Sequence, residues 1–381
     1  MPFTFKKQIF GFMDLLRFKK LVPNRRKMLE NGSPAALPKS YRVNDTAKIL
    51  HPGYQGAKLV AIAQNTADTK TYTFETERPL YFRAGQYLTL GCKIGKSEVS
   101  RPYAISSSPK EALSCRVSLT VKKCGFFSGY LFDSAAVGDS FVLGDPSGEF
   151  CYEPVKDADH VVAIAGGSGI TPFYSMAQAV ADGTNRHKLT IFYGARTESD
   201  LIFKKELDTL VSDKVKVVYV LSDEKKEGYE SGFIGAELLQ KYVSGDYTVM
   251  MCGPQAMYAF ADKELASLGL PIRRIKKEAN CVGLRDAEAK SYTLTVHIGF
   301  DTYTVPADAR ETILTALERA GLKVPSKCRA GGCGFCHSKL VCGSFSIAGQ
   351  DKRRLADAKF GYIHPCCSYP DSDMELIVPK A

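Results

Sequence analysis

The sequence predicts a multidomain protein of the α/β and β classes, in which an antiparallel β-barrel precedes a parallel sheet with helices and a small β-grasp domain. Three observations support this: five short alternating runs in the first third, an apolar run that enters a glycine-rich turn, and a cysteine group near the carboxyl end. A chain of 381 residues has room for roughly two to four domains. The expected domains are 55–156, 157–277 and 291–381, with an amino-terminal extension over 1–54 and a linker over 278–290.

The composition is that of an ordinary globular protein, with 45% hydrophobic and 24% charged residues. The net charge of +10 gathers at the amino end, where residues 1–50 hold 11 Lys and Arg against 3 Asp and Glu. The rest of the chain is nearly balanced in charge. The sequence therefore lacks the chain-wide basic surface of a nucleic-acid-binding protein.

Neither a membrane span nor a secretion signal is expected. The longest uncharged stretch near the middle, residues 160–181, contains three glycines and Pro172, which suit a strand, a turn and a helix. Asp14 and Arg17 interrupt the apolar residues near the amino end before a signal-peptide core can form. A cytoplasmic location is expected, where cysteines serve as metal ligands or remain reduced thiols.

The barrel is expected from short runs in which apolar and polar residues mostly alternate, separated by charged residues, glycine or proline. Such runs at even spacing are typical of antiparallel barrels. They cover residues 58–64, 71–76, 86–94, 98–106 and 116–123.

The second domain is expected from a buried-strand run, residues 160–165, followed by the turn Gly166 to Pro172 and residues with helical spacing. A strand, a glycine turn and a helix in this order can place a pyrophosphate at the helix N-terminus. Further parallel strands are expected over 189–193, 215–221 and 247–251, the last leading into Cys252-Gly253-Pro254.

The third domain carries Cys328, Cys333 and Cys336 with the spacing C-x4-C-x2-C, and Cys366 follows thirty residues later. This is the spacing of plant-type [2Fe–2S] ligation, whereas zinc sites more often show two CxxC pairs. Glycines at 331, 332 and 334 allow the loop to wrap closely around a cluster. Strands over 292–298 and 302–305 and a helix over 313–320 complete the expected β-grasp domain.

Several motifs resemble those of known families. Residues 291–381 resemble a plant-type ferredoxin, and this resemblance selects Cys366 over Cys367 as the fourth cluster ligand. The run 101–106, RPYAIS, followed by Gly125 and Ser128, resembles the flavin motifs of the ferredoxin–NADP reductase family. GGSGITP and the later CGP resemble the pyridine-nucleotide motifs of that family.

The resemblance implies FAD, NAD(P)H and a [2Fe–2S] cluster as cofactors. Arg101 would contact a flavin phosphate and Tyr103 would provide a flat aromatic face. Ala104 stands where the family usually has Ser or Thr, and Ser106 or a backbone N–H could replace that hydroxyl. Cys252 would pack against the nicotinamide, with Glu278 as a nearby polar group. The other implied cofactor-binding residues are Pro102, Gly125, Ser128, Gly166, Gly167, Gly169, Thr171, Pro172, Arg196, Gly253 and Pro254.

The domain order is that of the phthalate dioxygenase reductase group. It implies an NAD(P)H:acceptor oxidoreductase in which FAD takes a hydride and the cluster passes single electrons to a partner such as an oxygenase or an anaerobic reductase component. Whether NADH or NADPH is used stays open, because Arg196 could bind a 2′-phosphate whereas Glu198 and Asp200 could bind a ribose hydroxyl. The alternative is a passive ferredoxin-type carrier or interaction protein with a degenerate reductase half, which Ala104 favours.

Residues 1–30 predict a basic amphipathic helix, which could lie on an anionic membrane surface or bind an acidic partner. Alternatively, its apolar side packs on the barrel. The apolar face comprises Phe10, Met13, Leu16 and Leu15, and the basic residues are Lys6, Lys7, Arg17, Lys19, Lys20, Arg25, Arg26 and Lys27.

Overall fold

The computed structural model describes residues 11–31, 41–95, 97–278, 284–347 and 349–380. The chain divides into two units, residues 1–46 and 47–381. The first unit contains helix α1 (Gly11–Glu30), and α2 (Arg42–Leu50) begins at its end. The described apolar side chains Leu16, Leu21 and Met28 of α1 are exposed. The side chains of Phe10, Met13 and Leu15, with Lys6 and Lys7, lie outside the described residues.

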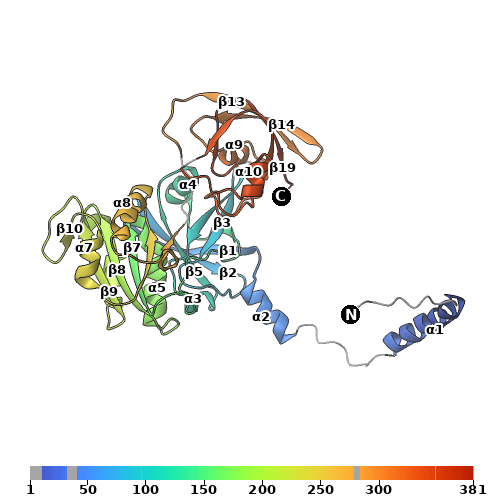
Figure 1. Ribbon diagram of the computed structural model, residues 1–381, viewed down its shortest axis with the longest axis horizontal. Helices are drawn as coiled ribbons and strands as arrows, with labels where there is room; N and C mark the ends of the chain where they lie inside the picture. Colours follow the sequence, from blue (N-terminus) through green and yellow to red (C-terminus); the bar gives the residue numbers. More distant parts are fainter. Residues whose placement is uncertain (1–10, 32–40, 96, 279–283, 348, 381) are drawn as a thin grey trace. The chain divides into compact units, whose positions relative to one another are not determined.

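The first sheet of the second unit is antiparallel, with strand order β4-β3-β6-β1-β2-β5 (Figure 1). A bridge between Ile105 and Leu119 joins its two outer strands, so the sheet closes into the predicted barrel. The sheet encloses a core that includes Leu59, Tyr72 and Leu88. The strands are β1 (Gln55–Thr66), β2 (Thr69–Thr76), β3 (Tyr87–Ile94), β4 (Ser97–Ala104), β5 (Arg116–Lys122) and β6 (Ser140–Leu143), with helices α3 (Pro109–Ala112) and α4 (Phe126–Ser134).

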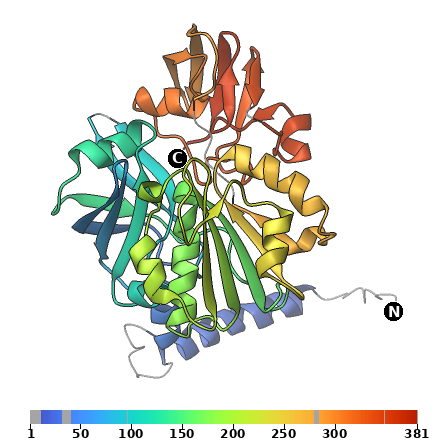
Figure 2. The same ribbon diagram turned by 90° about the vertical axis from the view of Figure 1, so that its left-hand side faces the viewer.

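The second sheet is parallel, as predicted (Figure 2), and its strand order is β10-β9-β8-β7-β11-β12. Helices α5 and α6 pack on one face and α7 and α8 on the other. The strands are β7 (His160–Gly166), β8 (Lys188–Ala195), β9 (Val215–Leu221), β10 (Glu230–Ser231), β11 (Thr248–Cys252) and β12 (Ile275–Lys277), and the helices are α5 (Thr171–Ala181), α6 (Lys204–Leu210), α7 (Ala236–Tyr242) and α8 (Gln255–Ala266).

The third domain is a five-stranded sheet of order β14-β13-β19-β15-β17, and α9 packs against it. Arg285, within the expected linker, already contacts this domain, because its side chain binds the Ala309 carbonyl at 2.7 Å and Asp371 at 2.7 Å. The elements are β13 (Ser291–Ile298), β14 (Asp301–Asp308), α9 (Ile313–Arg319), β15 (Ser338–Cys342), β16 (Phe345–Ile347), α10 (Leu355–Lys359), β17 (Tyr362–Ile363), β18 (Ser368–Pro370) and β19 (Met374–Val378).

Within the described ranges, no helix has both the length and the apolar character needed to cross a membrane.

Candidate functional site

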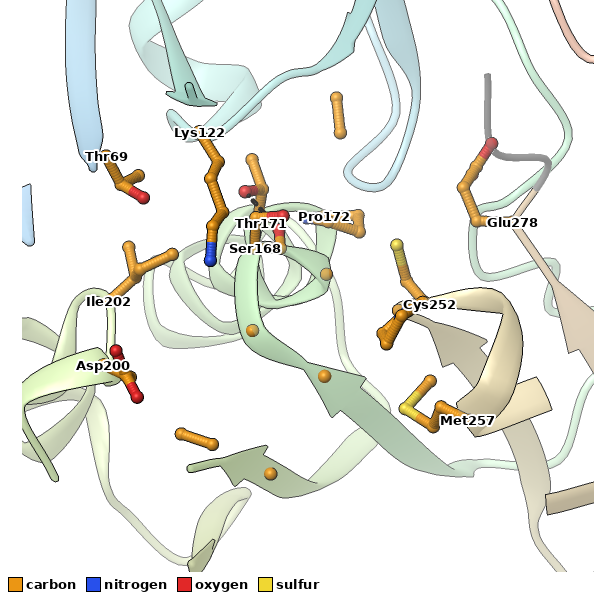
Figure 3. A pocket seen from close by; sticks show the side chains of 18 of the residues that line it. Thr69, Lys122, Ser168, Thr171, Pro172, Asp200, Ile202, Cys252, Met257 and Glu278 are labelled. Atoms are coloured by element: carbon orange, nitrogen blue, oxygen red, sulfur yellow. Dashed lines mark hydrogen bonds between the residues drawn. The ribbon is translucent and has the colours of Figure 1, made fainter. Parts of the chain in front are cut away.

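A cavity of about 970 Å³ lies between the barrel and the parallel-sheet domain. Its volume is at the upper end of the range for ligand pockets, as a large dinucleotide requires. Figure 3 shows Cys252 and Glu278 together at one end of the cavity, and Asp200 and Ile202 at the other. Lys122 extends between them from barrel strand β5. The cavity is therefore elongated, with chemically different ends.

The barrel wall of the cavity includes Pro102, Tyr103 and Ala104 at the end of β4. The ring of Tyr103 stacks on Phe127, with centroids 6.2 Å apart and planes 24° apart. Ala104 offers no hydroxyl at this wall. The cavity thus has an aromatic face on a closed barrel, which fits a flat ring system.

The hydroxyl of Ser106 is not brought to the cavity. Ser106 is buried in the barrel, where its Oγ accepts a hydrogen bond from Thr120 at 3.0 Å. Thr120 itself lines the cavity and also interacts with Thr71 at 2.9 Å. The sequence did not single out Thr120, because the alternation of apolar and polar residues in its strand does not indicate which hydroxyl faces a cavity.

Arg101 lies outside the cavity wall, although Pro102 and Tyr103 belong to it. Its guanidinium Nη1 donates to the Ser100 carbonyl at 2.8 Å and to Glu318 Oε2 at 2.9 Å. Glu318 belongs to α9 of the third domain. The predicted phosphate contact of Arg101 stays a prediction, and the structure adds a partner in another domain.

The second flavin motif forms the start of α4, with Gly125 at its N-cap. Ser128 is buried, and its Oγ accepts hydrogen bonds from the backbone N–H of Gly125 at 2.9 Å and of Cys124 at 3.0 Å. Cys124 lines the cavity, whereas the Ser128 side chain holds the turn behind it. Ser128 therefore stabilises the backbone of this turn without lining the cavity itself.

The parallel-sheet wall is built by the turn after β7, where Gly166, Gly167 and Gly169 line the cavity with Thr171 and Pro172. The Thr171 hydroxyl donates to the Ser168 carbonyl at 2.8 Å, which closes the turn at the start of α5. A β-carbon at Gly166 would meet Met257 Sδ at 2.8 Å. At Gly166 the turn therefore passes too close to the segment after β11 to carry a side chain.

Cys252, at the end of β11, is buried beside Glu278, and both line the cavity with Gly253 and Pro254. Burial, with the nearby Glu278 carboxylate, raises the pKa of the Cys252 thiol well above its usual range. The backbone N–H of Glu278 donates to the Met251 carbonyl at 3.0 Å. The structure thus brings together the two residues that were expected near the nicotinamide.

At the other end, Arg196 and Asp200 line the cavity, and Arg196 Nε lies 3.4 Å from Asp200 Oδ2. Glu198 instead binds Lys226 and Tyr229. Two aromatic residues that the sequence did not single out, Phe233 and Phe260, also line the cavity, with ring centroids 5.7 Å apart. They lie far from the flavin motifs in the sequence, which gave no signal for them.

The four predicted cluster ligands lie close together in the structure. The Cys328 side chain contacts those of Cys333 and Cys366, and the Cys336 side chain contacts Cys366. The backbone N–H of Ala330 donates to Cys328 Sγ at 3.4 Å. No group of three or more His, Cys, Asp and Glu side chains in the described part of the chain has the spacing for a single metal ion. A [2Fe–2S] cluster requires four thiols around two irons instead.

The adjacent Cys367 has different surroundings. Its side chain contacts Cys366, and its Sγ donates to the His364 carbonyl at 3.5 Å. A β-carbon at Gly331 would lie 2.7 Å from Cys367 Sγ, so this thiol packs on the loop backbone. Of the two neighbouring thiols, Cys366 is the one that contacts Cys328 and Cys336.

The buried side chain of His364 forms a hydrogen bond with the backbone of the cysteine loop. Its Nδ1 lies 2.7 Å from the Gly331 carbonyl oxygen and its Nε2 lies 3.0 Å from Asp357 Oδ2. Asp357 also pairs with Arg354 at 2.7 Å. This network anchors the cluster loop to α10, as partners behind metal ligands commonly do.

Cys328 also lines the large cavity, together with Tyr103 and the glycine turn. The first cysteine of the cluster motif therefore lies at the wall of the cavity that the other two domains enclose.

Three family descriptions match the chain, in the order of its domains. They are an oxidoreductase FAD-binding domain over residues 56–152, an oxidoreductase NAD-binding domain over 163–263 and a 2Fe-2S iron-sulfur cluster binding domain over 296–371. The solved structure of phthalate dioxygenase reductase is similar with a TM-score of 0.65 and 25% identity, covering 86% of this chain and 98% of that chain.

Curated relatives match most of this chain and nearly the whole of their own length. The glycine betaine monooxygenase reductase subunit of Chromohalobacter salexigens is 29% identical, covering 85% of this chain and 95% of the relative. The NADH oxidoreductase HCR of Escherichia coli is 30% identical, with 83% and 95% covered. The chain belongs to the ferredoxin–NADP reductase family, in the group that carries a carboxyl-terminal plant-type [2Fe–2S] ferredoxin domain, and it passes electrons from NAD(P)H through FAD and the cluster to a partner redox protein.

Proposed function

We propose that the partner redox protein is the oxygenase component of a multicomponent monooxygenase or dioxygenase. The observation that carries the electron route through this chain is the shared cavity, in which Tyr103, Cys252 and Cys328 line one space. Electrons that enter beside Cys252 can therefore leave through the cysteine loop. The names of relatives, which include monooxygenase reductase subunits, support an oxygenase over an anaerobic reductase component as the acceptor.

When bound, FAD accepts a hydride from NAD(P)H and the [2Fe–2S] cluster passes electrons one at a time. Tyr103 supplies the flat face for the flavin ring, and Arg101 keeps donors beyond those used for Glu318 to contact a phosphate. Cys328, Cys333, Cys336 and Cys366 supply the thiolates. The balanced reaction converts one NAD(P)H and two oxidised one-electron acceptors into NAD(P)⁺, one proton and two reduced acceptors.

The parallel-sheet domain positions the nicotinamide. The glycine turn brings backbone N–H groups near the dinucleotide phosphates at the start of α5, where the helix dipole favours negative charge. The Cys252 thiol stays protonated because burial and Glu278 raise its pKa. Cys252 would therefore pack as a neutral side chain against the ring, with Glu278 lining the same end of the cavity.

For the nucleotide we propose NADH. Asp200 lines the cavity and already pairs with Arg196, so the guanidinium is partly neutralised where a 2′-phosphate would need it. A carboxylate can instead accept a hydrogen bond from a ribose 2′-hydroxyl. One relative is named an NADH oxidoreductase. The ratio of kcat/KM for NADH to that for NADPH tests this choice.

The experiment that tests the electron route mixes the protein, loaded with FAD and cluster, with NADH under anaerobic conditions. The flavin absorbance should bleach first and the cluster absorbance should follow, and electrons should then reach an added oxygenase. Bleaching of neither cofactor would support the passive carrier instead.

Three further expectations remain proposals. The domain boundaries are those of the sequence prediction, 55–156, 157–277 and 291–381. The protein acts in the cytoplasm, where NAD(P)H is supplied. Residues 1–30 dock on an anionic membrane or an acidic partner, since the exposed apolar side chains of α1 lie among exposed basic ones, including Arg17, Lys19 and Arg26. Sedimentation with anionic vesicles, with and without residues 1–30, tests the docking.

A further inference from the structure

Three charged side chains meet where the barrel contacts the third domain. Glu318 on α9 accepts hydrogen bonds from Arg101 on β4, at 2.9 Å, and from Arg329 in the cysteine loop. The exposed fractions of the three side chains are 8% for Glu318, 19% for Arg101 and 7% for Arg329. One buried carboxylate thus joins two cations that belong to different functional segments.

Each arginine lies close in the chain to a residue on the proposed electron route, Tyr103 for Arg101 and Cys328 for Arg329. Arg101 lies two residues before Tyr103, which lines the flavin cavity. Arg329 directly follows Cys328, and its backbone has a φ of +52°, a conformation in which a non-glycine residue is strained. A shift of the Arg329 side chain would therefore move Cys328 and the turn that leads to Cys333.

The charges depend on one another because little water reaches them. Burial and the nearby Arg329 lower the pKa of Arg101, and Glu318 opposes this effect. Without the Glu318 carboxylate, two buried cations would face each other unpaired, which a protein interior disfavours strongly. At the exposed edge of the same contact, Lys323 pairs with Glu98 at 2.8 Å, and both side chains are more than half exposed. That outer pair contributes little, as surface ion pairs usually do.

We propose that Glu318 is a positioning residue, which holds the cluster-binding loop at a fixed place on the flavin-binding strand through Arg329 and Arg101. It touches neither the flavin cavity nor the cysteine ligands. Its function is to keep the separation of the two redox sites constant, so that electrons pass quickly from the flavin to the cluster. The inference rests on the proposed electron route and adds to it a residue that no cofactor motif contains.

The test uses the full chain loaded with FAD and cluster, and compares the wild type with Glu318→Gln. Glutamine keeps the shape of glutamate but removes the charge that pairs both arginines. After anaerobic mixing with NADH, flavin bleaching should keep its rate within about twofold. The following reduction of the cluster should slow by about 10- to 100-fold, as expected when reacting groups lose their alignment.

A second readout does not depend on activity. Trypsin should cut the segment between Lys277 and Lys290 faster in Glu318→Gln than in the wild type, because the third domain is held less firmly. Lys323→Ala is the matched control at the same contact, and both its cluster reduction and its cleavage should resemble the wild type. Glu318→Asp, which keeps the charge, should restore part of the transfer rate and serves as the variant if glutamine prevents folding.

Two outcomes would overturn the inference. One is a folded Glu318→Gln protein that reduces its cluster as fast as the wild type. The other is an equal loss of flavin bleaching and cluster reduction, which would assign Glu318 a general folding role. If the wild type itself fails to bleach its flavin with NADH, the proposed electron route fails instead, and the comparison of variants separates the two cases.

Discussion

Gly169 lies directly against the backbone of Cys252: a β-carbon on Gly169 would be 2.0 Å from the Cys252 carbonyl oxygen. No real side chain tolerates that distance, so the glycine turn and the end of β11 can approach each other only because residue 169 is glycine. This contact brings the glycine turn and the end of the cavity that holds Cys252 and Glu278 together.

Gly169→Ala is expected to force these two backbones apart. We expect the protein to lose about 1–3 kcal/mol of stability through overpacking and to lose about tenfold or more in the rate of flavin reduction by NADH. Cluster content should stay normal, because the third domain is not touched. Gly194→Ala is the control with a milder contact, since its β-carbon would meet the flexible end of Ile234 at 3.3 Å and the Ala165 carbonyl oxygen at 3.6 Å, an ordinary contact distance. A Gly169→Ala variant with unchanged flavin reduction would contradict the packing argument.

Cys366→Ser should abolish the [2Fe–2S] absorption spectrum and most of the bound iron, whereas Cys367→Ser should keep both. The reason is that Cys366 contacts Cys328 and Cys336, while Cys367 points to the Gly331 backbone and the His364 carbonyl. Iron analysis and visible spectra of the two purified proteins decide between the thiols. The opposite pattern would move the fourth ligand to Cys367.

Arg101→Ala should lower FAD affinity by about one to two decades, because a charge-assisted phosphate contact contributes about 1.5–3 kcal/mol. Cluster content should fall far less. Titration of the apo-flavin protein with FAD, beside iron analysis, measures both. Equal loss of the two cofactors would assign Arg101 only to the contact with Glu318.

Cys252→Ala should slow flavin reduction by NADH by about tenfold or more, since the nicotinamide would lose the side chain on which we propose it packs. In the wild type, the thiol should resist iodoacetamide in mildly alkaline buffer, because burial and Glu278 raise its pKa and the reactive thiolate does not form. Exposed Cys342 serves as the internal control for labelling. Peptide mapping by mass spectrometry reads out both cysteines, and rapid labelling of Cys252 would refute the assigned environment.

His187 makes the parallel-sheet domain sensitive to acid. It is buried against Tyr152, with ring centroids 4.0 Å apart, and burial lowers its pKa from 6.5 to about 4. The folded state therefore favours the neutral ring. As the pH falls, the unfolded chain binds a proton at His187 at a higher pH than the folded protein does, and this proton uptake favours unfolding. The stabilisation is complete above pH 6.5 and is lost as the pH falls towards 4, by about 3 kcal/mol at most.

His187→Phe should keep the ring contact and remove this loss. Denaturant midpoints measured at several pH values between 7 and 4.5 should fall less steeply in the variant than in the wild type. Replacement of the exposed His51 by Gln is the control and should leave the slope unchanged. Identical slopes in the wild type and His187→Phe would contradict the assigned pKa.

Much of the fold was predictable because its signals are local. The alternation over 71–76 and 116–123 reflects one face of each strand that packs in the core and one that is mostly half-buried, and both segments lie in strands, β2 and β5. The short strands β6, β10 and β12 were not predicted. Each has two to four residues, too few for a period to emerge, and each exists because a neighbouring strand offers free backbone groups.

For the site, the sequence by itself determined the chemistry: a cysteine spacing that only a few kinds of metal centre use, and a turn in which three of the first four residues are glycines. Both features depend on residues that are close together in the chain, so they can be recognised from the spacing of residues in the sequence. Only the tertiary structure decided which of two adjacent thiols contacts Cys328 and Cys336, that Thr120 rather than Ser106 reaches the cavity, and that Arg101 pairs with Glu318 of another domain. Such contacts join residues far apart in the chain, and their energy comes from burial and charge pairing that exist only after the domains have packed.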